Sequence, residues 1–159
     1  GAKGIIGSPS FFLLPPSFRH HTQSISEAAM PVQTFSLAAD GDKHIGKHFK
    51  VREFACRDGS DLILISTETV ELLDKVREYY NAPVTINSGY RTPEYNRRIN
   101  GAKHSQHCKG TAADFVVNGL APQKVQADIR AGRIFGPHRG GLGSYSNFTH
   151  LDTGPKREW

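Results

Sequence analysis

Cysteine is scarce in this sequence, with two in 159 residues, Cys56 and Cys108. Two cysteines cannot form the framework of bridges that holds many small secreted domains together. A single bridge stays open, and two free thiols would fit synthesis in a reducing cytosol. The chain is long enough for one ordinary domain, so we expect a hydrophobic core to carry the fold.

Long apolar runs and internal repeats are also lacking. No segment has the roughly 20 apolar residues that cross a membrane as a helix, and we therefore expect no membrane span. The short run "FFLLPP" at residues 11–16 ends in two prolines and is too weak for the core of a signal peptide. We therefore expect a protein made in the cytoplasm without a clear signal peptide.

Basic clusters are absent although the net charge is +5. The Lys and Arg residues are scattered, so the sequence does not predict a nucleic-acid-binding protein. The positive charge would suit an anionic cell-wall polymer. A composition with 37% hydrophobic and 22% charged residues is typical of a globular chain, for which we expect a monomer.

The chain divides into two parts by its patterning. Residues 1–44 lack sustained periodicity, and we interpret them as an N-terminal extension, part of it a tag or leader. The domain is expected over residues 45–159. Predicted helices cover 65–81, 92–100 and 121–132, and predicted strands cover 84–87, 110–117 and two short runs within 140–154. This mixture predicts an α+β fold with a small antiparallel sheet and flanking helices.

Three polar side chains point to a metal site. Asp114 interrupts the apolar strand "GTAADFVV", His107 precedes it across a Lys-Gly turn, and His150 lies on the last predicted strand. Two imidazoles and a carboxylate match a catalytic zinc centre with an open fourth position. An Asp114 paired with Arg91, or capping a turn, explains the same spacing without a metal.

Longer motifs resemble a known family. The segment "SQHCKGTAADF" at 105–115 matches the S-x-H-x-x-G-x-A-x-D signature of the M15 family of zinc D-Ala-D-Ala peptidases. The segments "SGYRTPEYN" at 88–96 and "FTHLDTG" at 148–154 resemble its upstream and closing motifs, in the expected order. The entry segment at 49–61 resembles the bacterial and phage subgroup, and the closing "HLDTGPKREW" is similar to the murein endopeptidase branch.

The resemblance implies a Hedgehog/D-Ala-D-Ala-peptidase-like fold and a role for several residues. It implies zinc ligands at His107, Asp114 and His150, and at Arg91 an arginine that steadies the oxyanion. Ser88 and Ser105 match positions that shape the substrate pocket.

The general base is where the sequence departs from the family. Other branches place an acid or histidine two or three positions before the last ligand, where this chain has Phe148 and Asn147. Asp152 is the nearest acid, and it either takes the proton or orients an imidazole N–H. We favour the orienting role. His104 and His138 are further candidates for the base.

The implied activity is zinc-dependent hydrolysis of an amide in peptidoglycan stem peptides, at the cell wall, by an endolysin or a wall-remodelling enzyme. A D-Ala-D-Ala or other D,D bond is the leading expectation, and L-Ala-D-Glu or L,D cleavage is the alternative. A non-catalytic wall-binding or virion module that keeps the fold is the alternative of another class, supported by Asn147 standing where an acid is expected.

Overall fold

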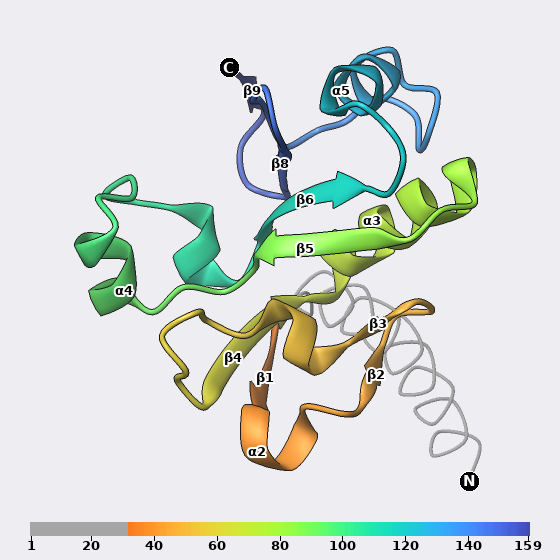
Figure 1. The fold of residues 1–159 in the computed structure, drawn as a ribbon. Coiled ribbons are helices and arrows are strands. Elements are labelled where there is room, and N and C mark those ends of the chain that lie inside the picture. The colour runs from red at the N-terminus through yellow and green to blue at the C-terminus, as the bar shows by residue number, and fades with distance from the viewer. Residues whose placement is uncertain (1–31) are drawn as a thin grey trace, which may run out of the picture. The chain divides into compact units, whose positions relative to one another are not determined.

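The computed structural model of the protein describes residues 32–159. The expectations for residues 1–31 lie outside these described residues. The elements in chain order are β1 (Val32–Ser36), α2 (Leu37–Asp40), β2 (His44–Ile45), β3 (Phe49–Lys50), the 3₁₀ turn η1 (Val51–Phe54), β4 (Leu62–Ser66), α3 (Thr67–Tyr80), β5 (Val84–Ser88), α4 (Pro93–Arg98), the 3₁₀ turn η2 (Gln106–Lys109), β6 (Ala112–Val117), α5 (Pro122–Arg130), β7 (Gly141–Ser144), β8 (Thr149–Asp152) and β9 (Arg157–Glu158). Figure 1 shows their course.

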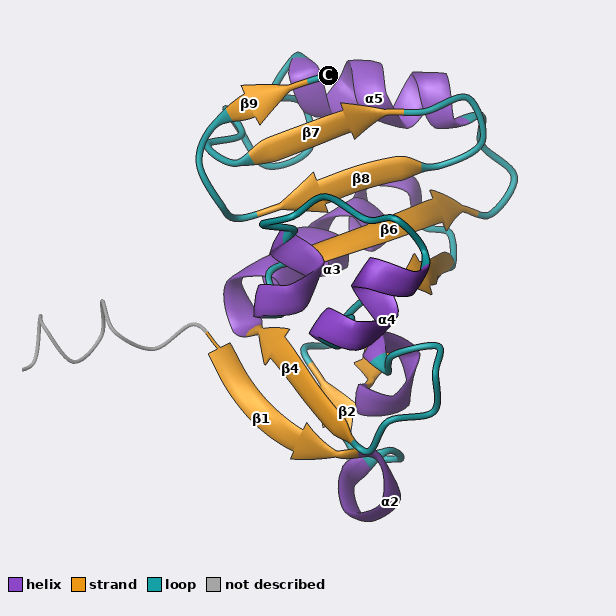
Figure 2. Ribbon diagram, turned by 90° about the vertical axis from the view of Figure 1, so that its left-hand side faces the viewer, coloured by secondary structure: helices purple, strands orange, loops and turns teal. Residues whose placement is uncertain are grey.

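A five-stranded sheet in the order β5-β6-β8-β7-β9 is the centre of the fold. Neighbouring strands run antiparallel, except that β9 joins β7 in parallel. Figure 2 shows β6, β8, β7 and β9 lying in this order. The register sets Asp114 of β6 directly opposite His150 of β8, which brings together two residues 36 positions apart.

The two faces of this sheet have different surroundings. Side chains alternate along a strand, so Ala113 and Phe115 of β6 and Leu151 of β8 enter the fully buried core. Helices α3 and α5 contact the sheet and lie behind its strands in the view of Figure 2. Asp114 and His150 therefore point to the opposite face, toward η2.

Local signals in the sequence explain the helix ends. The Ser66 side chain accepts the backbone N–H of Thr69 and caps α3, while Asn81 ends this helix in the left-handed conformation with φ of 50°. Thr92 caps α4 by accepting the N–H of Tyr95, and Pro93 occupies its first turn. These helices agree with the predictions, with shorter bounds.

The compact unit includes residues that precede the boundary expected near residue 44. Strand β1 pairs antiparallel with β4, from Val32 opposite Ser66 to Ser36 opposite Leu62, and Phe35 packs against the hydrophobic core. The compact unit therefore begins at Val32. Short strands carry too few residues for a clear alternation, so β1 shows little periodicity in the sequence.

The α+β mixture with small sheets is confirmed, while the more specific Hedgehog/D-Ala-D-Ala-peptidase-like fold stays a prediction. The main sheet is mixed rather than purely antiparallel, because β9 adds a parallel edge that was not predicted. Both cysteines are free thiols. Within residues 32–159, the helices are all too short or too polar to span a membrane.

Candidate metal centre

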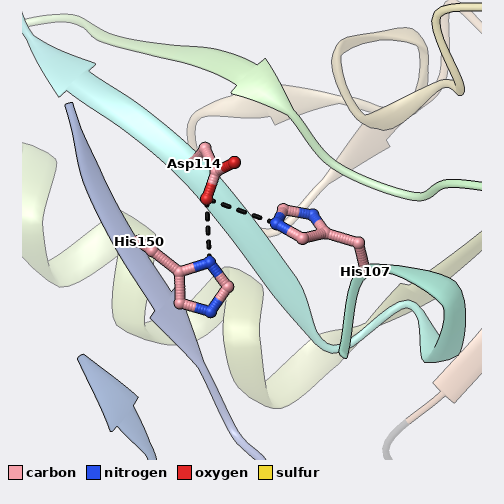
Figure 3. A group of neighbouring side chains, drawn as sticks. All are labelled: His107, Asp114 and His150. Atoms are coloured by element: carbon pink, nitrogen blue, oxygen red, sulfur yellow. Dashed lines mark hydrogen bonds and ion pairs between the residues drawn. The ribbon is translucent and has the colours of Figure 1, made fainter. Parts of the chain in front are cut away.

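Three elements bring His107, Asp114 and His150 together, as Figure 3 shows. His107 lies on η2, Asp114 on β6 and His150 on β8. Gly110 turns the chain between the first two with φ of 76°, a conformation that favours glycine. All three side chains are buried, and one ligand atom from each lies within 4.8 Å of the other two.

Each imidazole has an acceptor outside this cluster that fixes one of its N–H groups. The Nδ1 of His107 lies 2.8 Å from the backbone carbonyl of Gly89, which can only accept, so Nδ1 carries the proton. The Nε2 of His150 lies 2.7 Å from a carboxylate oxygen of Asp152 and is the protonated nitrogen for the same reason.

The remaining nitrogens both face Asp114. Its Oδ1 is 3.2 Å from Nε2 of His107 and 2.8 Å from Nδ1 of His150. In neutral rings these are two lone pairs turned toward a carboxylate oxygen. Either a second proton on each ring or one shared cation relieves that repulsion. Two imidazole nitrogens and one carboxylate oxygen are ligands that zinc prefers, so the residues present fit this metal.

The ionisation of the cluster follows from its hydrogen bonds. Burial raises the pKa of Asp114, but the bonds with His107 and His150 outweigh it and hold this pKa well below its usual range. Burial lowers the pKa of His150, but the bonds with Asp114 and Asp152 outweigh it and leave this pKa raised. The centre is thus built around a carboxylate that stays ionised.

Asp152 lies behind His150 and is fully buried. Besides the His150 contact, its Oδ1 accepts the backbone N–H groups of Gly141 at 3.1 Å and Gly154 at 2.9 Å. The Arg157 guanidinium reaches both of its oxygens, at 3.0 and 2.9 Å. A carboxylate enclosed by these donors has no face open to a water molecule in the cleft. This arrangement suits orienting an imidazole rather than taking a proton from substrate water.

Arg91 stands on the other side of Asp114, with its Nη2 3.4 Å from Oδ2. The Oγ of Ser88 accepts its Nε–H at 3.1 Å, and the Oδ1 of Asn96 accepts an Nη1–H at 3.2 Å. The Nδ2 of Asn96 in turn donates to the carbonyl of Ala102 at 2.9 Å. This bond turns the amide oxygen of Asn96 toward Arg91 and fixes the plane of the guanidinium.

A cleft of about 500 Å³ opens over the cluster. Its lining residues include the following: Arg91, His104, Ser105, His107, Asp114, Tyr145, Phe148, His150, Arg157 and Trp159. Ser105 lies on the cleft and caps η2 by accepting the N–H of His107. Ser88 does not line the cleft but lies behind Arg91. His138 lies elsewhere, against the carbonyl of Gly141.

Sequence reasoning missed four side chains that surround the centre: Asn96, Tyr145, Arg157 and Trp159. Trp159 lies with its ring 5.1 Å from that of His150, and its Nε1 donates to the hydroxyl of Tyr145 at 2.7 Å. The signal for Arg157 and Trp159 was their alternation in "REW", which is typical of a strand with two side chains on one face.

Comparison with known proteins places the chain in a family. Residues 47–152 match the profile of the family Peptidase M15, a match that includes all three residues of the cluster. The chain belongs to this family, and the resemblance seen in the motifs is confirmed.

Named relatives cover about half of the chain. The peptidoglycan L,D-endopeptidase MepK of Escherichia coli K12 is 39% identical over 84 residues, which are 48% of this chain and 43% of the relative. The probable peptidoglycan L,D-endopeptidase MepK of Haemophilus influenzae is 41% identical over 86 residues, 50% of this chain and 44% of the relative. The zinc D-Ala-D-Ala carboxypeptidase of Streptomyces albus G is 34% identical over 83 residues, 48% of this chain and 30% of the relative. The matched regions thus span less than half the length of these relatives.

Proposed function

We propose that this chain is a zinc-dependent peptidase that hydrolyses an amide bond in peptidoglycan stem peptides. The observation that carries the proposal is the convergence of Nε2 of His107, Oδ1 of Asp114 and Nδ1 of His150. Membership of family M15 and the named substrates of the relatives support the same reading.

The residues divide the chemistry between them. Bound zinc would supply a Lewis acid that polarises the scissile carbonyl and acidifies water. His107, Asp114 and His150 would hold the ion, with their tautomers set by Gly89 and Asp152. The guanidinium of Arg91 has further N–H groups beyond those that Ser88 and Asn96 accept. These groups would stabilise negative charge on the carbonyl oxygen as the amide is attacked.

Proton transfer falls to a group that lines the cleft. Besides the proposed ligands His107 and His150, the described lining of the cleft contains the imidazole of His104, and an imidazole can serve as a general acid or base. We assign it the proton shuttle to the leaving amine, and we assign Asp152 the orienting role because its carboxylate is enclosed. Ser105, at the cleft rim, remains a proposed substrate contact.

Which bond of the stem peptide is cleaved is a more specific proposal. The named activity of the two MepK relatives favours an L,D bond, and their identities of 39% and 41% exceed the 34% of the D-Ala-D-Ala carboxypeptidase. This reverses the order expected from the motifs, in which a D,D bond came first. A D,D bond is therefore the second candidate, favoured by the Streptomyces relative.

Digestion of a defined set of muropeptides tests both the peptidase activity and the choice of bond. Crosslinked and uncrosslinked stem peptides with L,D and D,D bonds are incubated with the protein, and mass spectrometry identifies the products. We expect new termini at L,D bonds, loss of cleavage with a chelator, and recovery with added zinc. A wall-binding module would instead sediment with sacculi and release no peptide, which would overturn the proposal.

The substitution His107→Ala tests the metal ligands directly. Removing one of three ligands should abolish stoichiometric zinc, measured by elemental analysis after dialysis, together with cleavage. His44→Ala, at an exposed position on β2, is the matched control and should keep both. Full zinc content in dialysed His107→Ala would contradict the ligand assignment.

A further inference from the structure

The family match ends at Asp152, yet the chain continues into the site. After a turn, β9 runs parallel to β7, with Arg157 opposite Gly141. The strand pairing extends to Trp159, whose N–H donates to the carbonyl of Leu142 at 3.2 Å and whose own carbonyl accepts the N–H of Ser144 at 2.8 Å. The segment 157–159 is therefore a fixed edge of the sheet.

Two glycines of β7 let side chains of this edge reach β8. A Cβ on Gly141 would lie 2.5 Å from Oδ2 of Asp152 and 2.6 Å from Nη1 of Arg157, and a Cβ on Gly143 would lie 2.8 Å from the Trp159 ring. Atoms cannot approach this closely, so any side chain on β7 at these positions would separate β9 from β8. The glycines make a groove across which Arg157 contacts Asp152 and Trp159 contacts His150.

The contact between Arg157 and Asp152 has the geometry of a fork. Both guanidinium ends bond one carboxylate oxygen each, which fixes the carboxylate plane as well as its charge. The same carboxylate holds the Nε2–H of His150 at 2.7 Å. Trp159 lies against both ends of this chain of contacts, with its ring 5.1 Å from the His150 ring and 5.1 Å from the Arg157 guanidinium.

We propose that Arg157 is a positioning residue for the metal centre: it fixes the Asp152 carboxylate so that His150 presents Nδ1 to the metal. This inference rests on the proposed zinc function. Partners behind a ligating histidine set its tautomer and ring orientation, and their loss typically weakens metal binding about 10- to 100-fold. Arg157 acts one contact further out, through Asp152.

Zinc affinity, measured by competition with a chelating dye, tests the inference apart from catalysis. We expect Arg157→Gln to weaken zinc binding about 10-fold. Glu158→Gln is the matched control, because the Glu158 side chain follows Arg157 in the chain but pairs with Arg130 at 3.0 Å on a half-exposed site. This variant should bind zinc like the parent. Should Arg157→Gln fold poorly, Arg157→Lys keeps the charge but loses the fork, and it should weaken zinc in the same direction.

A double variant separates positioning from a general structural effect. If Arg157 acts through Asp152, then Arg157→Gln combined with Asp152→Asn should bind zinc no more weakly than Asp152→Asn alone. The inference would be overturned if the losses of zinc affinity multiply in the double variant, or if Arg157→Gln and Arg157→Lys bind zinc like the parent. If the parent binds zinc and cleaves stem peptides in that case, the proposed function stands. A parent protein without zinc affinity would contradict both this inference and the proposed function.

Discussion

Asp114 is the residue on which the site converges, because its carboxylate faces His107, His150 and Arg91 at once. Burying an unpaired carboxylate is costly, so a strand that is otherwise apolar carries it only where these partners exist. Neighbouring residues also fix the orientation of these partners. Asn96 and Ser88 hold the guanidinium of Arg91, so its orientation is set before any substrate arrives.

The substitution Arg91→Lys tests this orientation. Lysine keeps the positive charge but cannot bond Ser88 and Asn96 and still present a planar fork to the cleft. Turnover should fall on the order of a hundredfold, the scale of losing one oxyanion donor, with unchanged zinc content. Arg97→Lys, at an exposed position on α4, is the control and should turn over normally. Normal turnover in Arg91→Lys would assign Arg91 to structure alone.

The sequence could predict residues whose motif is local or shared with a family. His107 and Asp114 belong to one continuous signature, and the structure brings both together with His150 as that signature led us to expect. Arg157 and Asn96 could not be predicted in this way. Their roles depend on the register of β9 beside β7 and on the path of the loop to Ala102. The alternation in "REW" indicates a strand but not the strand with which it pairs.

At the scale of elements, predictions succeeded where caps and periodicity coincide. Helix α3 has a serine cap and a regular apolar face, and α4 has a threonine cap followed by proline. Strands β1 and β4 gave weaker signals. The strand at 62–66 passes straight into the helix at Thr67, so the predicted helix began at residue 65 and included the end of the strand.

Removal of β1 tests its place in the domain. A chain that begins at Ile45 lacks β1, helix α2 and the β2 residue His44. It loses the partner of β4 and the partly buried Phe35 and Leu37, about 2–3 kcal/mol of apolar burial. It should melt roughly 10 °C below a chain that begins at Val32, measured by circular dichroism. Zinc content should persist, because the three proposed ligands come from η2, β6 and β8. Equal melting temperatures would show that residues 32–44, β1 among them, do not stabilise the domain.

At the scale of the whole molecule, the proposed metal joins the neighbouring residues His107 and Asp114 to His150, which lies 36 positions after Asp114. His107 comes from the turn η2, which follows α4 in the chain, whereas Asp114 and His150 come from the central sheet. The sheet is also where both helices α3 and α5 pack. One ion shared by the three side chains would therefore link the loop region around η2 to the core.

Such a link predicts that zinc stabilises the fold as a whole. A ligand that binds only the folded state at 100 times its dissociation constant adds about 2.7 kcal/mol to the free energy of unfolding, or roughly 10 °C in melting temperature for a domain of this size. Thermal unfolding of the chelated parent with and without zinc measures this shift. His107→Ala should show no shift, because the two ligands that remain are too few to hold zinc. The melting temperature of His44→Ala should rise with zinc as that of the parent does. A parent whose melting temperature does not change with zinc would contradict the proposed metal centre.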